Sequence, residues 1–176
     1  MRNRTLPHQL LLLALLSLPA VPALAATRIE VQAGRSFMDT HGTNAAFVES
    51  VFTEHPLGDS RLTWSPDITA GWIEGRDVAH YRRARYTTGD DVWLVAAGAR
   101  FRIRTPDAWY RRMFFSFQPA YHSGRTQALS SGYEFVSTLG WQMHRWSVEI
   151  RHVSNGGLHE PNRGETMALV GLAFTL

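Results

Sequence analysis

The sequence predicts an all-β protein, an eight-stranded antiparallel transmembrane β-barrel of the outer-membrane type. Three observations lead to this fold class. Apolar residues recur at every second position from Thr27 onward, charged residues of both signs share the opposite strand faces, and aromatic residues crowd the strand ends. A length of 176 residues with 44% hydrophobic residues fits one modest folded domain and excludes intrinsic disorder.

The first 25 residues have the pattern of an export signal. Arg2 and Arg4 begin it, an apolar run covers residues 10–18, and small residues end at Ala25. That run is shorter than the ~20 residues that cross a bilayer as a helix. We therefore expect a signal peptide over 1–25, cleaved after Ala25, and a single β-barrel domain over 26–176.

Strand periodicity divides the rest of the chain into eight segments. In the first segment Ile29 and Val31 have one parity, whereas Glu30 and Gln32 have the other. The second segment alternates less cleanly, and the third continues the pattern. The predicted strands lie near 28–37, 46–54, 61–73, 92–104, 112–122, 132–142, 144–154 and 166–176.

The fourth segment has the clearest separation of faces. Val95 and Phe101 belong to an apolar face, and Arg100, Arg102 and Arg104 occupy the other face. Three arginines on one strand face require polar surroundings. The polar faces of the other segments also carry charged side chains, and we expect ion pairs between charges of opposite sign in the barrel interior.

Alternation alone fits either a soluble sandwich or lipocalin-like barrel with its oily face inside, or a membrane barrel with its oily face outside. Charged side chains of both signs on the polar faces favour the membrane barrel, because they can pair with one another in a polar lumen. The eighth segment runs to the C-terminus with Phe174 and Leu176, as in barrels of the outer membrane. Aromatic residues at strand ends, typical of membrane interfaces, are Trp64, Trp72, Trp93, Trp109, Tyr110, Tyr121, Tyr133, Trp141 and Trp146.

Connectivity predicts the orientation of the barrel. Both termini of such barrels usually lie in the periplasm, and the external loops are longer than the periplasmic turns. We expect external connections at 38–45, 74–91, 123–131 and 155–165, with periplasmic turns at 55–60, 105–111 and 142–144. The expected location is the bacterial outer membrane, with the end of the seventh strand toward the outer leaflet.

Composition narrows the chemistry. The chain has no Cys, which excludes disulfides, thiolate metal sites and thiol nucleophiles. All 18 cationic side chains are Arg, and the net charge of +3 falls to +1 when Arg2 and Arg4 leave with the signal peptide. This small charge does not indicate a nucleic-acid partner. No cluster of carboxylates or histidines has metal-ligand spacing, so we expect no metal and no cofactor.

The seventh segment carries the candidate chemistry. Trp146, Val148 and Ile150 form its apolar face, and His152 and Ser154 share their parity. Residues two apart on a strand point the same way, so the imidazole can reach the hydroxyl and act as the base that a serine nucleophile needs. The alternative is a polar pair above the hydrocarbon region that only bonds water and loop backbone.

The sequence around this pair resembles the signature of the outer-membrane lipid A 3-O-deacylases (PagL family). The matching residues are Arg151-His152-Val153-Ser154-Asn155, then Pro161-Asn162, then Gly164-Glu165. The resemblance implies an ester hydrolase that removes the 3-O-linked acyl chain of lipid A. It makes Ser154 the nucleophile, His152 the general base and Glu165 the carboxylate that orients the imidazole. Glu160 lies in the same loop and is an alternative orienting residue.

The same resemblance assigns the oxyanion hole to the side-chain amide of Asn162 and the backbone N–H of Gly157. We expect Asn155 to be structural and to close the turn after the strand.

Substrate contacts are expected on two surfaces. Trp146, Val148 and Ile150 face the lipid and would bind the acyl chain. Arg82, Arg83 and Arg85 in the long external loop would bind the lipid A phosphates, because guanidinium forks suit phosphate, although a solvated loop explains them equally well.

Two other functions fit parts of the sequence. A non-catalytic barrel, structural or solute-conducting, explains everything except the His, Ser and loop residues, and an outer-membrane phospholipase or esterase of other specificity explains those as well. The sequence leaves the oligomeric state open, including a homodimer.

Overall fold

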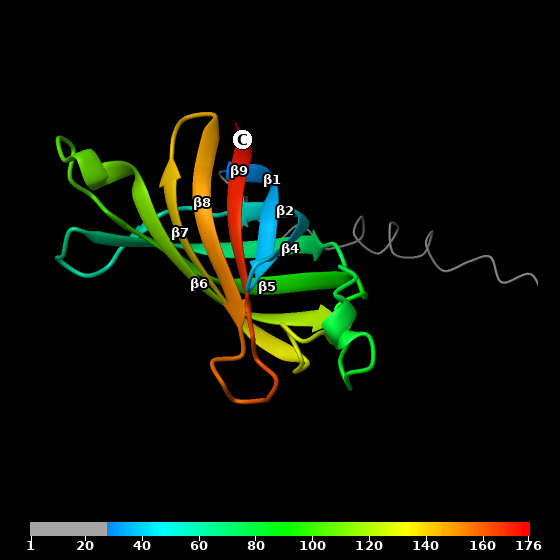
Figure 1. The fold of residues 1–176 in the computed structure, drawn as a ribbon. Helices are drawn as coiled ribbons and strands as arrows, with labels where there is room; N and C mark the ends of the chain where they lie inside the picture. Colours follow the sequence, from blue (N-terminus) through cyan, green and yellow to red (C-terminus); the bar gives the residue numbers. More distant parts are fainter. Residues whose placement is uncertain (1–27) are drawn as a thin grey trace, which may run out of the picture.

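The computed structural model describes residues 28–176, which form a closed barrel of eight long antiparallel strands (Figure 1). Each long strand pairs with the next, β2 pairs with β4, and β9 returns to β1, so the cylinder closes. The long strands are β1 (Arg28–Met38), β2 (His41–Val51), β4 (Leu62–Ile73), β5 (Val92–Ile103), β6 (Met113–Ser123), β7 (Tyr133–Gln142), β8 (Trp146–Ser154) and β9 (Glu165–Thr175). The predicted eight-stranded barrel is confirmed, while the expected signal peptide lies outside the described residues.

Three short elements lie in the connections between the long strands. Strand β3 (His55–Pro56) pairs with the start of β4, 3-10 helix η1 (Ala79–Tyr81) lies in the connection after β4, and η2 (Trp109–Arg112) leads into β6. No helix in the described part of the chain has the length and hydropathy to cross a bilayer.

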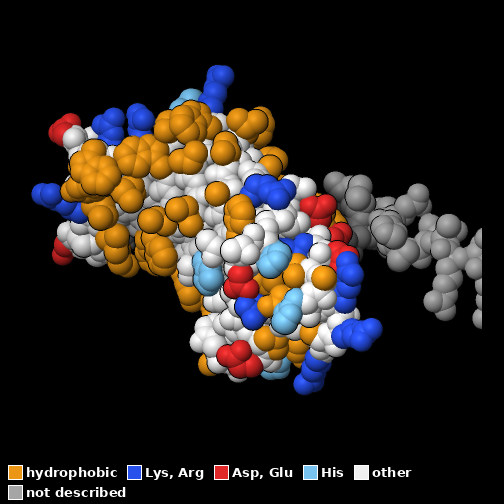
Figure 2. Space-filling view, in the orientation of Figure 1, with side chains coloured by type: hydrophobic (Ala, Val, Ile, Leu, Met, Phe, Trp, Pro, Cys, Tyr) orange, Lys and Arg blue, Asp and Glu red, His pale blue; other side chains and the backbone are white. Residues whose placement is uncertain are grey.

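The barrel is polar inside and apolar outside. On β1, Glu30 and Gln32 are 0% exposed, whereas Val31 between them is 50% exposed. On β5, Arg100 is 1% exposed and Val95 is 56% exposed. Hydrophobic side chains accordingly cover a broad part of the outer surface in Figure 2. This arrangement suits a lipid-facing exterior and excludes the soluble barrel with an oily interior.

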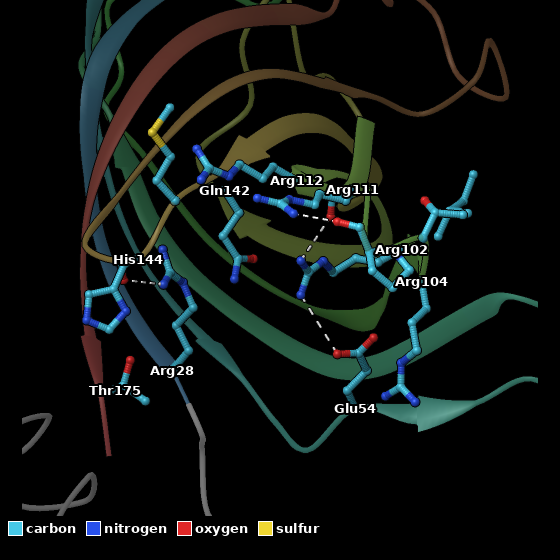
Figure 3. Close-up of a pocket in the computed structure, with 13 residues that line it drawn as sticks. Arg28, Glu54, Arg102, Arg104, Arg111, Arg112, Gln142, His144 and Thr175 are labelled. Atoms are coloured by element: carbon cyan, nitrogen blue, oxygen red, sulfur yellow. Dashed lines mark hydrogen bonds and ion pairs between the residues drawn. The ribbon is translucent and has the colours of Figure 1, made fainter. Parts of the chain in front are cut away.

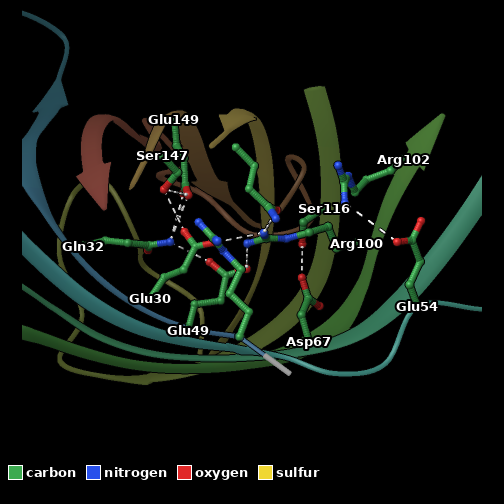
Figure 4. A network of polar contacts seen from close by, with 12 residues as sticks. Glu30, Gln32, Glu49, Glu54, Asp67, Arg100, Arg102, Ser116, Ser147 and Glu149 are labelled. Carbon is green, nitrogen blue, oxygen red and sulfur yellow. Dashed lines mark hydrogen bonds and ion pairs between the residues drawn. The ribbon is translucent and has the colours of Figure 1, made fainter. Parts of the chain in front are cut away.

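A network of ion pairs fills the middle of the barrel (Figure 4). Glu49 accepts hydrogen bonds from Arg100 at 2.8 Å and from Arg151 at 2.7 Å. Glu30 accepts from Arg100 at 3.1 Å and from the Ser147 hydroxyl at 2.7 Å. Buried charges are tolerated when they are paired in this way. Arg100 and Arg151 thus form the expected lumen ion pairs, whereas Arg104 is exposed and forms no ion pair within residues 28–176. An interior filled by these side chains argues against a solute channel.

Toward the β8–β9 connection, the interior becomes apolar. Phe47, Leu94, Leu129, Val153 and Met167 belong to one buried hydrophobic cluster and are each at most 2% exposed. This cluster lies directly behind the end of β8, because Val153 is one of its members. It supports the strand that carries the candidate chemistry.

The predicted second strand and first external loop were wrong. The chain turns at Asp39 and Thr40, and β2 begins at His41, so the 38–45 loop is a tight hairpin. Asp39 adopts the left-handed conformation (φ 53°) that such a turn uses, a conformation that Asp tolerates better than most residues. The polar residues after the turn resemble a loop in sequence, but they pair with the end of β1.

Candidate active site

The candidate site lies at the end of β8, where the chain enters the 155–164 loop before β9 (Figure 1). His152 is exposed and Ser154 is partly buried, whereas Arg151 and Val153 are 0% exposed. His152 and Ser154 therefore lie on the outer face of β8, the face that also carries Ile150. The structure agrees with the parity that the sequence predicted for this pair.

One ring nitrogen of His152 is held by β9. The imidazole Nδ1 and the Thr166 hydroxyl share a hydrogen bond of 3.0 Å. The two residues are direct partners in the antiparallel pairing of β8 with β9, so the sheet register creates this contact. The contact leaves Nε2 as the ring nitrogen for a proton transfer.

Gly164 supports the other side of the imidazole. Its φ of +70° is a left-handed conformation that favours glycine. A Cβ atom on this residue would lie 2.8 Å from the His152 Cε1 atom and 3.3 Å from Nε2. The backbone N–H of Gly164 donates to the Ala128 carbonyl at 3.0 Å, which fixes the residue against the ring. The loop thus approaches His152 closely only because this residue has no side chain.

Asn155 organises the loop after β8. Its side chain is 0% exposed; it donates to the His159 carbonyl at 2.9 Å and accepts from the Gly157 N–H at 3.0 Å. Its backbone N–H donates to the Asn162 side-chain oxygen at 3.2 Å. The structural role expected for Asn155 is therefore present, and the loop closes on itself beside Ser154.

The two predicted oxyanion donors differ in their availability. The Asn162 side-chain oxygen is held by Asn155, and its amide nitrogen donates to no described residue. The Gly157 N–H, in contrast, already donates to Asn155. Of the two, only the Asn162 amide is free for a new acceptor in this conformation.

The structure does not bring Glu165 to His152. Glu165 is 5% exposed and faces the barrel interior, where it accepts hydrogen bonds from Ser36 at 2.5 Å and from Arg76 at 2.8 Å. Glu160, the predicted alternative, is exposed and accepts from the Asn162 N–H at 3.2 Å. Neither carboxylate contacts the imidazole.

The signal for Thr166 was present in the alternation of β9. Glu165 shares its parity with Met167 and Leu169, which are buried, whereas Thr166 shares its parity with Val170, which is 58% exposed. A residue that meets the outward-facing His152 must itself face outward. The family resemblance points to Glu165, whereas the alternation of β9 points to Thr166.

Comparison with known proteins identifies the family. A family model described as lipid A 3-O-deacylase (PagL) matches residues 28–175. The chain belongs to the lipid A 3-O-deacylase (PagL) family. Members of this family are ester hydrolases, so the expected enzyme class is confirmed.

A solved structure supports the fold. The barrel is similar to the crystal structure of the outer membrane enzyme PagL, with a TM-score of 0.56 and 18% identity. The similarity covers 85% of this chain and 99% of the other. No curated protein sequence matches this chain. Family and barrel fold together indicate the bacterial outer membrane as the location of this PagL-family protein.

An apolar groove of about 460 Å³ lies on the outer surface of this PagL-family barrel, along β7, β8 and β9. Of the predicted acyl-chain residues, Val148 and Ile150 line it, whereas Trp146 lies at the far end of β8 and does not. The groove is also lined by Leu139, Trp141, Ala168 and Val170. Ile150 and Ala168 are paired residues one pleat below His152 and Thr166, so the groove leads to the candidate site.

The predicted cationic loop lies at the same end of the barrel as Ser154. Arg82 is engaged by Asp77 at 2.6 and 2.8 Å, and these hydrogen bonds lower the pKa of the Asp77 carboxyl. Arg85 lies over the Tyr86 ring at 5.3 Å, and Arg83 is exposed. At neutral pH, Arg83 and Arg85 are therefore freer than Arg82 to meet an anion.

The loops at this end are joined to one another. The Gln127 side chain donates to the Tyr86 carbonyl at 2.6 Å, and the Gln127 N–H donates to the Thr87 carbonyl at 3.0 Å. His159 shares a 2.8 Å hydrogen bond with the Ser130 hydroxyl. Residues 28–176 contain no group of three His, Asp or Glu side chains that could hold a metal ion.

Proposed function

We propose that this protein hydrolyses the 3-O-linked acyl ester of lipid A, with Ser154 as nucleophile and His152 as general base. The observation that carries the proposal is the pair itself: both residues lie on the lipid-facing side of β8, with His152 held at Nδ1 by Thr166. A serine becomes an effective nucleophile when a neighbouring base accepts its proton.

The reaction follows from these positions. The Ser154 Oγ attacks the ester carbonyl carbon while His152 Nε2 takes the hydroxyl proton. The Asn162 amide donates to the oxygen that becomes negative. The ester C–O bond then breaks as His152 donates the proton to the departing sugar oxygen. His152 next accepts a proton from the water that attacks the acyl-serine, the fatty acid is released, and the proton returns to the Ser154 oxygen.

We assign to Thr166 the orienting role that the sequence gave to Glu165. When Nδ1–H donates to the Thr166 Oγ1, the tautomer is set and Nε2 is left unprotonated, so that it can accept the serine proton. Glu165 instead joins β1 and β9 to the 74–91 loop through Ser36 and Arg76.

The proposed substrate position uses the surfaces on either side of the pair. The acyl chain lies in the groove along Val148 and Ile150, and the lipid A phosphates meet Arg83 and Arg85 above it. With periplasmic termini, the end of β8 reaches the outer leaflet, so the ester is attacked within the membrane. A homodimer is not needed, because one chain supplies every group of the site.

The decisive experiment is mass spectrometry of lipid A from cells that express the protein. Wild-type protein should remove one 3-linked acyl chain, whereas S154A and H152A should each lose nearly all of this activity. The double variant should be no worse than either single variant, because members of a catalytic unit act together.

Ser123→Ala is the matched control. Ser123 is exposed at the loop end of β6, on the outer face but on another side of the barrel. This variant should keep wild-type activity. Wild-type activity in a folded S154A barrel would refute the proposed nucleophile, and release of acyl chains from phospholipid alone would indicate the other esterase class.

A further inference from the structure

A second site lies at the barrel end opposite to His152 and Ser154. A cavity of about 580 Å³ opens there among the strand ends and turns (Figure 3). Its charged lining residues are Arg28, Glu54, Arg102, Arg104, Arg111 and Arg112. We refer to it as the basic vestibule.

The charges of the basic vestibule are unbalanced. Five guanidinium groups line it and only one carboxylate, Glu54, does so. The nearest approach of Glu54 to Arg102 is a long 3.8 Å ion pair, and Arg104 and Arg112 form no ion pair within residues 28–176. A cavity lined by such an excess of positive charge attracts anions.

Two of the lining arginines have buried side-chain donors without a protein acceptor within residues 28–176. The Arg28 side chain is 9% exposed, with its Nε bonded to Glu30 and one Nη to the His144 carbonyl. Its other terminal nitrogen, Nη2, is buried with no partner in the described part of the chain. The Arg102 Nε is also buried and without a partner. Buried donors without acceptors are costly, and a bound anion would satisfy them.

The tryptophans beside the basic vestibule indicate that it lies at the level of the membrane interface. Trp109 and Trp141 stack at 6.1 Å beside Arg111 and Arg112, and Trp109 is 72% exposed. Exposed tryptophans of this kind gather at the level of lipid headgroups. Guanidinium forks recognise phosphate through paired N–H donors.

We propose that the basic vestibule is a binding site for a phosphate group. The ligand is either a soluble phosphate anion or the phosphodiester headgroup of an anionic phospholipid. The site shares no residue with the candidate active site, so its occupation is independent of the catalytic serine.

Calorimetric titration of the purified barrel in uncharged detergent tests the proposal. One arm titrates pyrophosphate, and the other titrates dihexanoyl phosphatidylglycerol against dihexanoyl phosphatidylcholine. Wild-type protein should bind at least one phosphate-bearing anion but not the zwitterionic lipid. R104Q/R112Q should bind at least about tenfold more weakly, because two charge-assisted donors are removed.

The matched control is R61Q/R145Q, which removes two exposed arginines from turns at the same barrel end that do not line the cavity. It should change the affinity by less than about twofold. S154A should bind as the wild type does, which separates this site from the proposed catalysis.

Binding of pyrophosphate alone identifies a soluble ligand, and binding of phosphatidylglycerol alone identifies a headgroup; both support the site. The proposal is overturned if neither anion binds the wild type at millimolar concentration. It is equally overturned if both double variants weaken binding to the same degree, since that result indicates diffuse charge attraction.

Discussion

At the scale of single residues, the position of His152 is set by two neighbours of different kinds. Thr166 provides a hydroxyl at 3.0 Å from Nδ1, and Gly164 provides the space in which the ring lies. A hydroxyl orients the ring but carries no charge, so it stabilises a protonated imidazole less than a carboxylate does. We therefore expect Thr166 to contribute to catalysis by orienting the His152 ring.

Replacement of Thr166 tests this assignment. T166V removes the hydroxyl with little change in shape and should lower kcat about tenfold with KM nearly unchanged, the equivalent of one lost hydrogen bond. T166S keeps the hydroxyl and should restore most of kcat. Steady-state kinetics on purified lipid A measures both constants.

Glu165→Gln is the companion variant. It keeps the shape of the side chain and leaves the His152 contact intact, so it should reduce kcat less than T166V does. A larger loss of kcat in E165Q than in T166V would make Glu165 the orienting residue and Thr166 incidental.

At the scale of elements, the alternating side chains of β8 face two environments, the polar barrel interior and the apolar outer surface. Its inward residues Ser147, Glu149 and Arg151 belong to the interior network, and its outward residues Val148 and Ile150 line the apolar groove. The candidate chemistry begins where this outer face reaches the loops. Figure 2 shows charged side chains at both ends of the apolar surface.

A bulky substitution in the groove tests where the acyl chain lies. I150W fills the groove one pleat below His152 and should raise KM or lower kcat/KM about tenfold or more, because a bound chain loses its apolar contacts. Kinetic measurement with lipid A in mixed micelles checks this result.

Val95→Trp is the control for the groove. Val95 is 56% exposed on the outer face of β5, away from the groove, and the variant should keep wild-type kinetics. Equal kinetics in I150W and V95W would place the acyl chain elsewhere on the barrel.

At the scale of the whole molecule, the barrel is held from inside by charge pairing. Arg100 on β5 and Arg151 on β8 both form ion pairs with Glu49 on β2, and all three side chains are at most 1% exposed. The loop end is closed instead by the apolar cluster behind Val153. The candidate site thus lies on a wall that is rigid on its inner side.

Loss of Glu49 should destabilise the barrel strongly. E49Q leaves two buried guanidinium groups without their shared carboxylate, which should cost about 3–5 kcal/mol of unfolding free energy. Urea unfolding in detergent, followed by heat-modifiable migration on gels, measures the loss. Asp59→Asn removes an exposed acid from a turn and should unfold as the wild type does, whereas equal stability of E49Q would contradict the importance of the network.

Export should remove residues 1–25. The N-terminal sequence of protein purified from outer membranes should begin at Ala26, and Ala25→Arg should block cleavage because the peptidase requires a small residue there. Mature wild-type protein that retains residues 10–18 would refute the predicted signal.

The amino-acid sequence by itself determined the architecture and the outward face of the site. Its period of two, with Glu30 and Arg100 on one face and Val31 and Val95 on the other, is a local property of each strand that needs no knowledge of neighbours. The same parity places His152 and Ser154 on the apolar outer face independently of any strand pairing.

Only the tertiary structure decided which residues meet across strands. The register of β8 with β9 puts Thr166 opposite His152 and turns Glu165 inward to Ser36 and Arg76. The tight turn at Asp39 likewise depends on pairing between β1 and β2. Without that pairing, the polar residues after the turn have the composition of a loop. Register arises from contacts between distant segments, and a shift of one residue exchanges every side chain between the two faces.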